Sequence, residues 1–109
     1  MGKKTEIPPG TLYMLILKTL AGGAMHGYGI AQRIHLLSNN VLEVEEGSLY
    51  PALQRMLIKG WLKAEWRPSE NNRRARYYTL TKSGRKQLGM ELSEFAKVVT
   101  AIHRVIETA

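Results

Sequence analysis

Three arginines, Arg73, Arg74 and Arg76, fall within four residues of one another. A guanidinium group stays charged and donates paired hydrogen bonds that match a phosphate or a carboxylate. Across residues 67–86, seven basic side chains are opposed by one carboxylate, that of Glu70. A charge concentrated in one segment predicts a binding site for a polyanion, in preference to a solvated face that only keeps the protein in solution.

The arginines lie between two stretches whose side chains alternate in polarity, as in strands with one buried face. We predict strands at residues 61–67 and 76–80, joined by a loop at 68–72 that is rich in Pro, Ser and Asn. The tip of this hairpin then carries the arginines. Tyr77 either faces a ligand beside them or packs against the neighbouring strand. The side chains predicted to face inward are Leu62, Ala64, Trp66, Tyr78 and Leu80.

An amphipathic helix directly precedes the hairpin. We expect Ser48 to be its N-cap and Gly60 to end it, with Pro51 tolerated in a first turn whose N–H groups lack helical partners. The buried stripe is Leu49, Leu53, Met56 and Leu57. The side chains offered to a ligand are Ser48, Tyr50, Pro51, Gln54, Arg55 and Lys59.

A helix followed by a basic two-stranded ribbon is the arrangement of a winged helix-turn-helix. The helix of such a domain enters the major groove of double-stranded DNA, and the ribbon, or wing, holds phosphates. Gln54 suits the edge of adenine and Arg55 that of guanine, and each bidentate contact contributes about 1–3 kcal/mol of discrimination. The predicted phosphate contacts are Arg73, Arg74 and Arg76, supported by Lys59, with Tyr77 as a further candidate.

The first half of the chain predicts two more helices. Residues 11–20 are apolar nearly all round, as in a central buried helix, and residues 28–37 follow with Gly27 at the N-cap. Residues 41–44 form either a short strand or a loop. We expect an N-terminal arm at residues 1–9 and the winged domain at residues 10–80.

The last segment, residues 81–109, predicts one long helix capped by Thr81. Its apolar residues recur at spacings of four and three, which is the heptad pattern of a helix that pairs with another helix. The preceding domain is too short to cover such a stripe, so a dimer is favoured over a helix folded back on its own domain. The predicted interface residues are Leu88, Leu92, Phe95, Val99, Ile102 and Ile106.

Several function classes are disfavoured. The chain of 109 residues has no cysteine, which excludes disulfides and thiol chemistry. His26, His35 and His103 lie in different segments, so we expect no metal, no cofactor and no enzymatic activity. The N-terminus does not resemble a signal peptide, and no apolar run is long enough to span a membrane.

Four motifs resemble those of the PadR-like transcriptional regulators, over about residues 10 to 88. The first two are Gly10-Thr11-Leu12 leading into Ile16-Leu17, and His26-Gly27-Tyr28-Gly29-Ile30. The other two are Gly47-Ser48-Leu49-Tyr50-Pro51-Ala52-Leu53 and Arg76-Tyr77-Tyr78-Thr79-Leu80-Thr81-Lys82-Ser83-Gly84. Details at residues 45–48 and 69–74 look like the acidobacterial-type subgroup.

The resemblance implies a homodimeric cytoplasmic repressor that binds a palindromic operator and releases it when an effector arrives. It also implies that residues 48–59 form the recognition helix and that the last helix lies at the dimer interface. Short relatives that bind flat drugs do so between tryptophans of the last helix, and this chain has none there. The expected fold is α+β, mainly α. The alternatives are a basic RNA-binding domain, which needs no dimer, and a winged-helix module that binds another protein.

Overall fold

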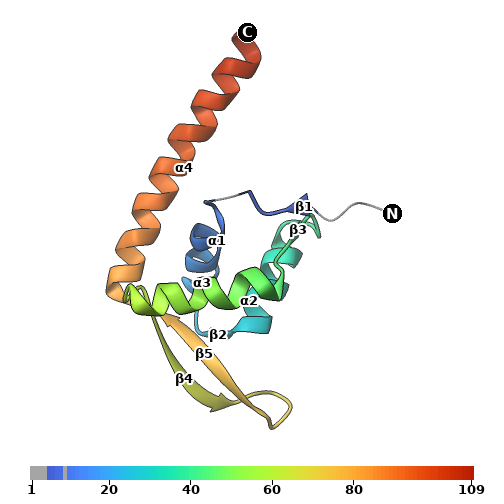
Figure 1. Cartoon of the computed structure of the whole chain (residues 1–109), viewed down its shortest axis with the longest axis vertical. Coiled ribbons are helices and arrows are strands. Elements are labelled where there is room, and N and C mark those ends of the chain that lie inside the picture. The colour runs from blue at the N-terminus through green and yellow to red at the C-terminus, as the bar shows by residue number, and fades with distance from the viewer. Residues whose placement is uncertain (1–4, 9) are drawn as a thin grey trace.

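A computed structural model describes residues 5–8 and 10–109 of the chain. Within these residues the helices are α1 (Leu12–Leu20), α2 (Gly27–Leu37), α3 (Glu46–Ile58) and α4 (Lys82–Thr108). The strands are β1 (Thr5–Glu6), β2 (Met25–His26), β3 (Leu42–Glu43), β4 (Leu62–Pro68) and β5 (Arg74–Leu80). Helices α1 to α3 form the body, the β4–β5 hairpin projects from one side, and α4 extends from the other (Figure 1). The expected α+β fold with a wing is confirmed.

The hydrophobic core lies between the three short helices and the base of the hairpin. Ile16 and Leu17 of α1 are completely buried, as a helix that is apolar nearly all round requires. They meet Ile30 of α2 and Leu49 and Met56 of α3, each at most 1% exposed. These contacts fix the position of α3, whose opposite side remains at the surface.

The hairpin pairs in register from Leu62 opposite Leu80 to Pro68 opposite Arg74. The short strand β2, which the sequence pattern did not indicate, pairs with the other edge of β5. The expectation that Trp66 faces the core is wrong, because its side chain is 58% exposed. The physical reason is length: the strands extend beyond the helices, so their inner face is covered only near its base.

Two predicted helix starts need correction. Helix α3 begins at Glu46 with Glu45 as N-cap, because the Glu45 carbonyl already accepts a hydrogen bond from the N–H of Leu49 at 2.9 Å. Pro51 therefore lies inside α3 instead of in its first turn. The carbonyl that loses a partner to this proline is that of Gly47, an exposed residue where water can hydrogen-bond instead.

Helix α2 is capped by His26 and not by Gly27, because the His26 ring accepts a hydrogen bond at Nδ1 from the N–H of Gly29 at 3.0 Å. The predicted cap of the last helix is confirmed: the Thr81 hydroxyl accepts a hydrogen bond from the N–H of Gly84 at 3.0 Å.

Of the two alternatives for residues 41–44, the structure contains the short strand: β3 covers Leu42–Glu43 and pairs in parallel with β1. The described part of the expected N-terminal arm, residues 5–8, is thus attached to the body, and Ile7 packs against the core. Residues 1–4 and 9 of that arm lie outside the described residues.

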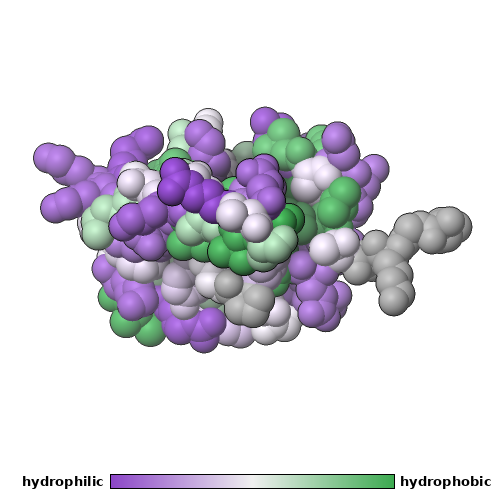
Figure 2. All heavy atoms as spheres, turned by 90° about the horizontal axis from the view of Figure 1, so that it is seen from above, coloured by the Kyte–Doolittle hydropathy of each residue, from purple (hydrophilic) through white to green (hydrophobic). Residues whose placement is uncertain are grey.

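Helix α4 is covered by its own domain for about two turns, from Lys82 to Leu88. Leu88 is buried, but four of the five apolar residues that follow it in the heptad pattern are exposed, with Ile102 and Ile106 at 52% and 68%. The fifth, Val99, is half-buried. Figure 2 views the molecule from above, so that the end of α4 points toward the viewer. In that view, apolar side chains lie at the surface among polar ones. The chain's own domain therefore covers only the start of the apolar stripe, which we define as Leu88, Leu92, Phe95, Val99, Ile102 and Ile106.

Candidate nucleic-acid interface

The outer side of α3 is the first part of the candidate site. Pro51, Gln54 and Ile58 are all exposed and succeed one another at spacings of three and four residues, so they share one face. Tyr50 lies on one flank of this face and Arg55 on the other. We call the whole surface, with Ser48 and Lys59, the recognition face.

The Tyr50 flank is shaped by the start of α2. A Cβ atom at Gly27 would lie 2.8 Å from the Tyr50 hydroxyl, so only glycine lets the tyrosine ring pack there. Gly29 gives similar room to the His26 ring, with 3.3 Å between its hypothetical Cβ and that ring. Gly27 thus lets Tyr50, which belongs to a different motif, pack beside α2, while Gly29 makes room for the ring that caps the helix.

The Arg55 flank is shaped by α1. The Nε of Arg55 donates a hydrogen bond of 2.6 Å to the hydroxyl of Tyr13, and its guanidinium lies 5.9 Å from the centre of that ring. Tyr13 in turn meets Trp61 edge-on at 5.8 Å, and the Lys59 ammonium lies 5.3 Å from the Trp61 ring. Arg55 and Lys59 are therefore held on the α1 side of the recognition face, apart from Tyr50.

The wing forms the second part of the site. Its loop is closed by a hydrogen bond of 2.6 Å from the N–H of Ser69 to the carbonyl of Arg73, with Asn72 in the left-handed conformation that Asn tolerates (φ 62°). Because β5 begins at Arg74, that arginine and Arg76 lie on the strand and only Arg73 lies in the loop. The loop between the strands, residues 69–73, has the predicted length of five residues and is shifted by one residue from the predicted 68–72.

A cleft of about 600 Å³ separates the wing from the helices, and we call it the wing groove. Arg73, Arg74 and Arg76 line it from the wing, and all three are exposed. Within the described residues, none of them forms a salt bridge. The residues that line the opposite wall are His26, Gly27, Tyr28, Gln32 and Tyr50. Glu70 lines the groove as well, so it combines three guanidinium groups and one carboxylate with aromatic and amide side chains.

Tyr77 lies on the other face of the hairpin, because side chains alternate along a strand and its neighbour Arg76 faces the groove. There it meets His26 edge-on at 5.3 Å, and the guanidinium of Arg67 lies 5.1 Å from its ring. Arg67 is also paired with Glu65 at 2.7 Å, so its charge is compensated within this face. Of the two alternatives for Tyr77, packing against its neighbours is the one that the structure contains.

Burial raises the pKa of the Tyr78 phenol, and the nearby charge of Arg76 opposes this effect. Tyr78 is therefore neutral at physiological pH and belongs to the core, where it is 5% exposed. It anchors the base of the wing groove without adding charge.

The start of α4 is bonded to the end of α3. The Thr81 hydroxyl donates a hydrogen bond of 2.6 Å to the carbonyl of Gly60, and the Thr81 N–H donates one of 3.0 Å to the carbonyl of Trp61. A Cβ atom at Gly84 would collide with that same Trp61 carbonyl, so the first turn of α4 fits only with glycine. We call this contact the α3–α4 joint.

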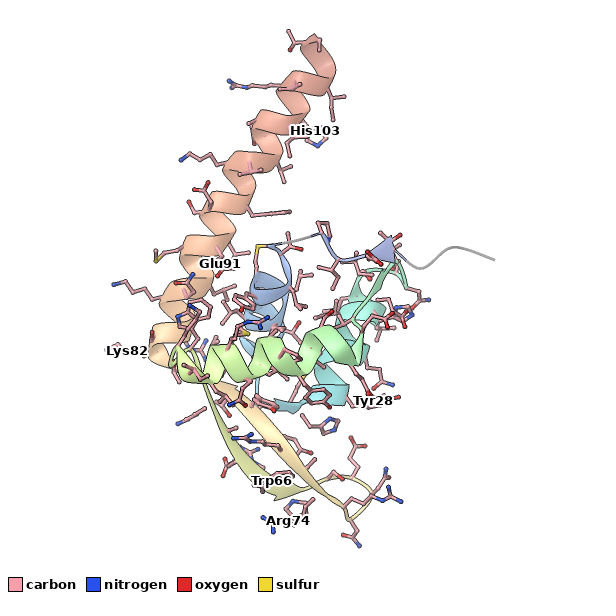
Figure 3. The ribbon with its side chains drawn as sticks, viewed as in Figure 1. Tyr28, Trp66, Arg74, Lys82, Glu91 and His103 are labelled. Atoms are coloured by element: carbon pink, nitrogen blue, oxygen red, sulfur yellow. The ribbon has the colours of Figure 1, made fainter. Side chains whose placement is uncertain are left out.

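The groove residues that were missed from the sequence include Trp66, Tyr28 and Gln32. Tyr28 is 66% exposed and lies at the start of α2, facing the side of the wing (Figure 3). A large aromatic side chain two residues into a helix, next to a glycine on each side, was the available signal. For Trp66, alternation alone predicted the correct face of β4, but it wrongly predicted that this side chain is buried.

Two findings bear on other chemistries. No three His, Asp or Glu side chains in residues 5–8 and 10–109 come together where they could hold a metal ion. None of the helices in this part of the chain is long and apolar enough to cross a membrane.

A helix with an exposed polar side, followed by a basic hairpin beside it, defines a DNA-binding winged-helix protein. The family model for the transcriptional regulator PadR-like family matches residues 16–90, well over half of the chain. The chain belongs to the PadR-like family of transcriptional regulators.

Solved structures agree with this assignment. The chain is similar to a transcriptional regulator from Clostridium thermocellum, with 26% identity and a TM-score of 0.80 over 87% of this chain and 92% of the other. It is also similar to a PadR family transcription regulator from Clostridium difficile, with 26% identity and a TM-score of 0.76 over 89% and 99% of the two chains. An uncharacterized protein X from Lysinibacillus sphaericus is 28% identical over 104 residues, 95% of each chain.

Proposed function

We propose that this regulator is a repressor that binds a palindromic operator as a homodimer and releases it when an effector binds. The observation that carries the proposal is that one chain leaves two separate surfaces exposed to solvent. The recognition face and wing are exposed at one end, and the apolar stripe of α4 is exposed along a helix that extends away from them (Figure 1). A second copy that covers the stripe would present a second recognition face.

The dimer proposal rests on what it costs to leave the stripe in water. Burying apolar surface stabilises an assembly by about 25 cal/mol per Å². The stripe spans five helical turns of α4 and is flanked by Val98 and Val105, which are 43% and 66% exposed. A two-fold axis through paired α4 helices would bury the same residues from both copies.

Within each half of the dimer we propose a division of labour. The recognition face reads bases in the major groove through Ser48, Tyr50, Pro51, Gln54, Arg55 and Lys59. Gln54 is central on that face, while the contact with Tyr13 directs Arg55 to the flank near α1. The wing holds phosphates through Arg73, Arg74 and Arg76, with Tyr77 bracing the hairpin from the opposite face. The proposed domains are an arm at residues 1–9, a DNA-binding domain at 10–80 and a dimerisation helix at 81–109.

Release by an effector is supported by the α3–α4 joint. The start of α4 is hydrogen-bonded to the residues that immediately follow α3, through Gly60 and Trp61. A ligand that changes how two α4 helices pack would therefore change the spacing of two recognition helices. Repression follows if the occupied operator overlaps the site where transcription begins.

The test is selection of bound sequences from a pool of random duplex DNA. We expect a palindrome whose halves lie about one helical turn, or 34 Å, apart. Recovery of a single unrepeated site would contradict the dimer, and recovery of no preferred sequence would contradict sequence-specific binding. Preference for a structured RNA over every duplex in a matched competition would favour an RNA-binding domain instead.

A further inference from the structure

Trp66 is a large aromatic side chain that the chain leaves in solvent. It is 58% exposed and lies on the face of β4 that continues from the buried Leu62. Between them, Ala64 is half-buried, so the core ends before Trp66 is reached. Packing within its own domain therefore does not account for this tryptophan.

The surroundings of Trp66 are positively charged. Its partner across the hairpin is Arg76, and the guanidinium of Arg74 lies 5.8 Å from the centre of the indole ring. All three side chains line the wing groove. The wing also projects away from α4, so a second copy joined through the apolar stripe would lie far from Trp66 (Figure 3).

The spacing of the two arginines fits a polyanion with an uncharged part between its charges. Arg74 and Arg76 are two residues apart on one face of β5, hence about 7 Å apart at the backbone. A DNA strand offers a phosphate, a largely apolar deoxyribose and then another phosphate. An exposed aromatic ring on the neighbouring strand, opposite Arg76 and beside the guanidinium of Arg74, is complementary to this repeat.

We propose that Trp66 is a DNA-contacting residue whose indole packs on a deoxyribose while Arg74 and Arg76 hold the phosphates on either side. This inference rests on the proposed function, since it needs a DNA strand in the wing groove. It assigns to the wing an apolar contact in addition to its charges. Such a contact depends on the shape of the backbone and not on salt.

Equilibrium binding to one fixed duplex at several salt concentrations separates Trp66 from its neighbours. Trp66→Ala should weaken binding roughly tenfold or more, as is typical for loss of an aromatic contact with nucleic acid. The slope of log K against log salt should stay at the wild-type value. Arg74→Ala should lower that slope by about one unit for each lost phosphate contact. Trp66→Phe should retain most of the affinity.

A second experiment observes the indole directly. The chain has two tryptophans, so Trp61→Phe leaves Trp66 as the sole emitter and Trp66→Phe leaves Trp61. Saturating duplex should protect Trp66 from acrylamide quenching. Trp61, which lies at the α3–α4 joint, is the matched control and should change little.

Each remaining outcome overturns the inference. If Trp66→Ala lowers the salt slope as Arg74→Ala does, the indole is only a platform that positions Arg74. If Trp66 stays equally accessible to acrylamide while the Trp61→Phe protein is saturated with duplex, the indole does not touch DNA. These results leave the proposed function intact, whereas failure of the wild-type chain to bind any duplex at low salt overturns both.

Discussion

Removal of two arginines from the wing, Arg73→Ala with Arg74→Ala, should weaken binding to every duplex by a similar factor. Both side chains are exposed and line the wing groove. Within the described residues neither is part of a salt bridge, so their removal leaves no carboxylate unpaired. The change should act on phosphate binding and leave the fold unaltered.

The size of the effect follows from the geometry of a dimer. Each phosphate that a protein neutralises contributes about 0.9 to the slope of log K against log salt. A dimer carries two wings, so the double variant loses up to four phosphate contacts. The slope should therefore become shallower by about 3–4 units.

The assay is fluorescence anisotropy with a labelled duplex, repeated over a range of salt concentrations and with several sequences. Arg67→Ala is the matched control, because Arg67 has the same charge but faces away from the groove and is paired with Glu65 at 2.7 Å. Its slope should remain close to the wild-type value. An unchanged slope for the double variant would refute the assignment of the wing to phosphates. A loss confined to some sequences would mean that the arginines read bases.

Three further predictions concern single positions. Gln54→Ala should relax base preference at one position in each half-site, by about 1–3 kcal/mol, and an unchanged preference profile from selection would remove Gln54 from the recognition face. Val99→Glu puts a charge in the middle of the apolar stripe and should give monomers by light scattering. The control Met90→Glu, on another side of α4, should remain dimeric. A dimeric Val99→Glu variant would contradict the interface. Gly84→Ala should destabilise the fold by about 1–3 kcal/mol in urea unfolding, because the added methyl meets the Trp61 carbonyl. Gly89→Ala, in the same helix with open space around it, should cost nothing, and equal effects for the two variants would refute the fit of the joint.

The sequence predicted the wing and the four helices well because their signals are local. Alternation along residues 61–67 and 76–80 follows from the two faces of a strand, and β4 and β5 begin and end within two residues of those bounds. Alternation says which way a side chain points but not how far the core extends. That is why Trp66 was placed in the interior.

Features that depend on contacts between distant segments could not be predicted. His26 caps α2 because pairing of β2 with β5 holds it in an extended conformation, and Tyr77 is its partner across that pair. Arg55 is turned toward α1 by Tyr13, which lies 42 residues earlier in the chain. Helical spacing alone gave Arg55 the same outward direction as Gln54.

The central claim is that two chains read two half-sites from one face of the duplex. The most direct measurement compares the affinity for the selected operator with that for a version carrying an insertion of half a helical turn between its halves. The insertion rotates one half-site to the opposite face, so a dimer joined through α4 should lose the second contact, and the affinity should fall to that of a single half-site. Equal affinity for the two duplexes would contradict the claim.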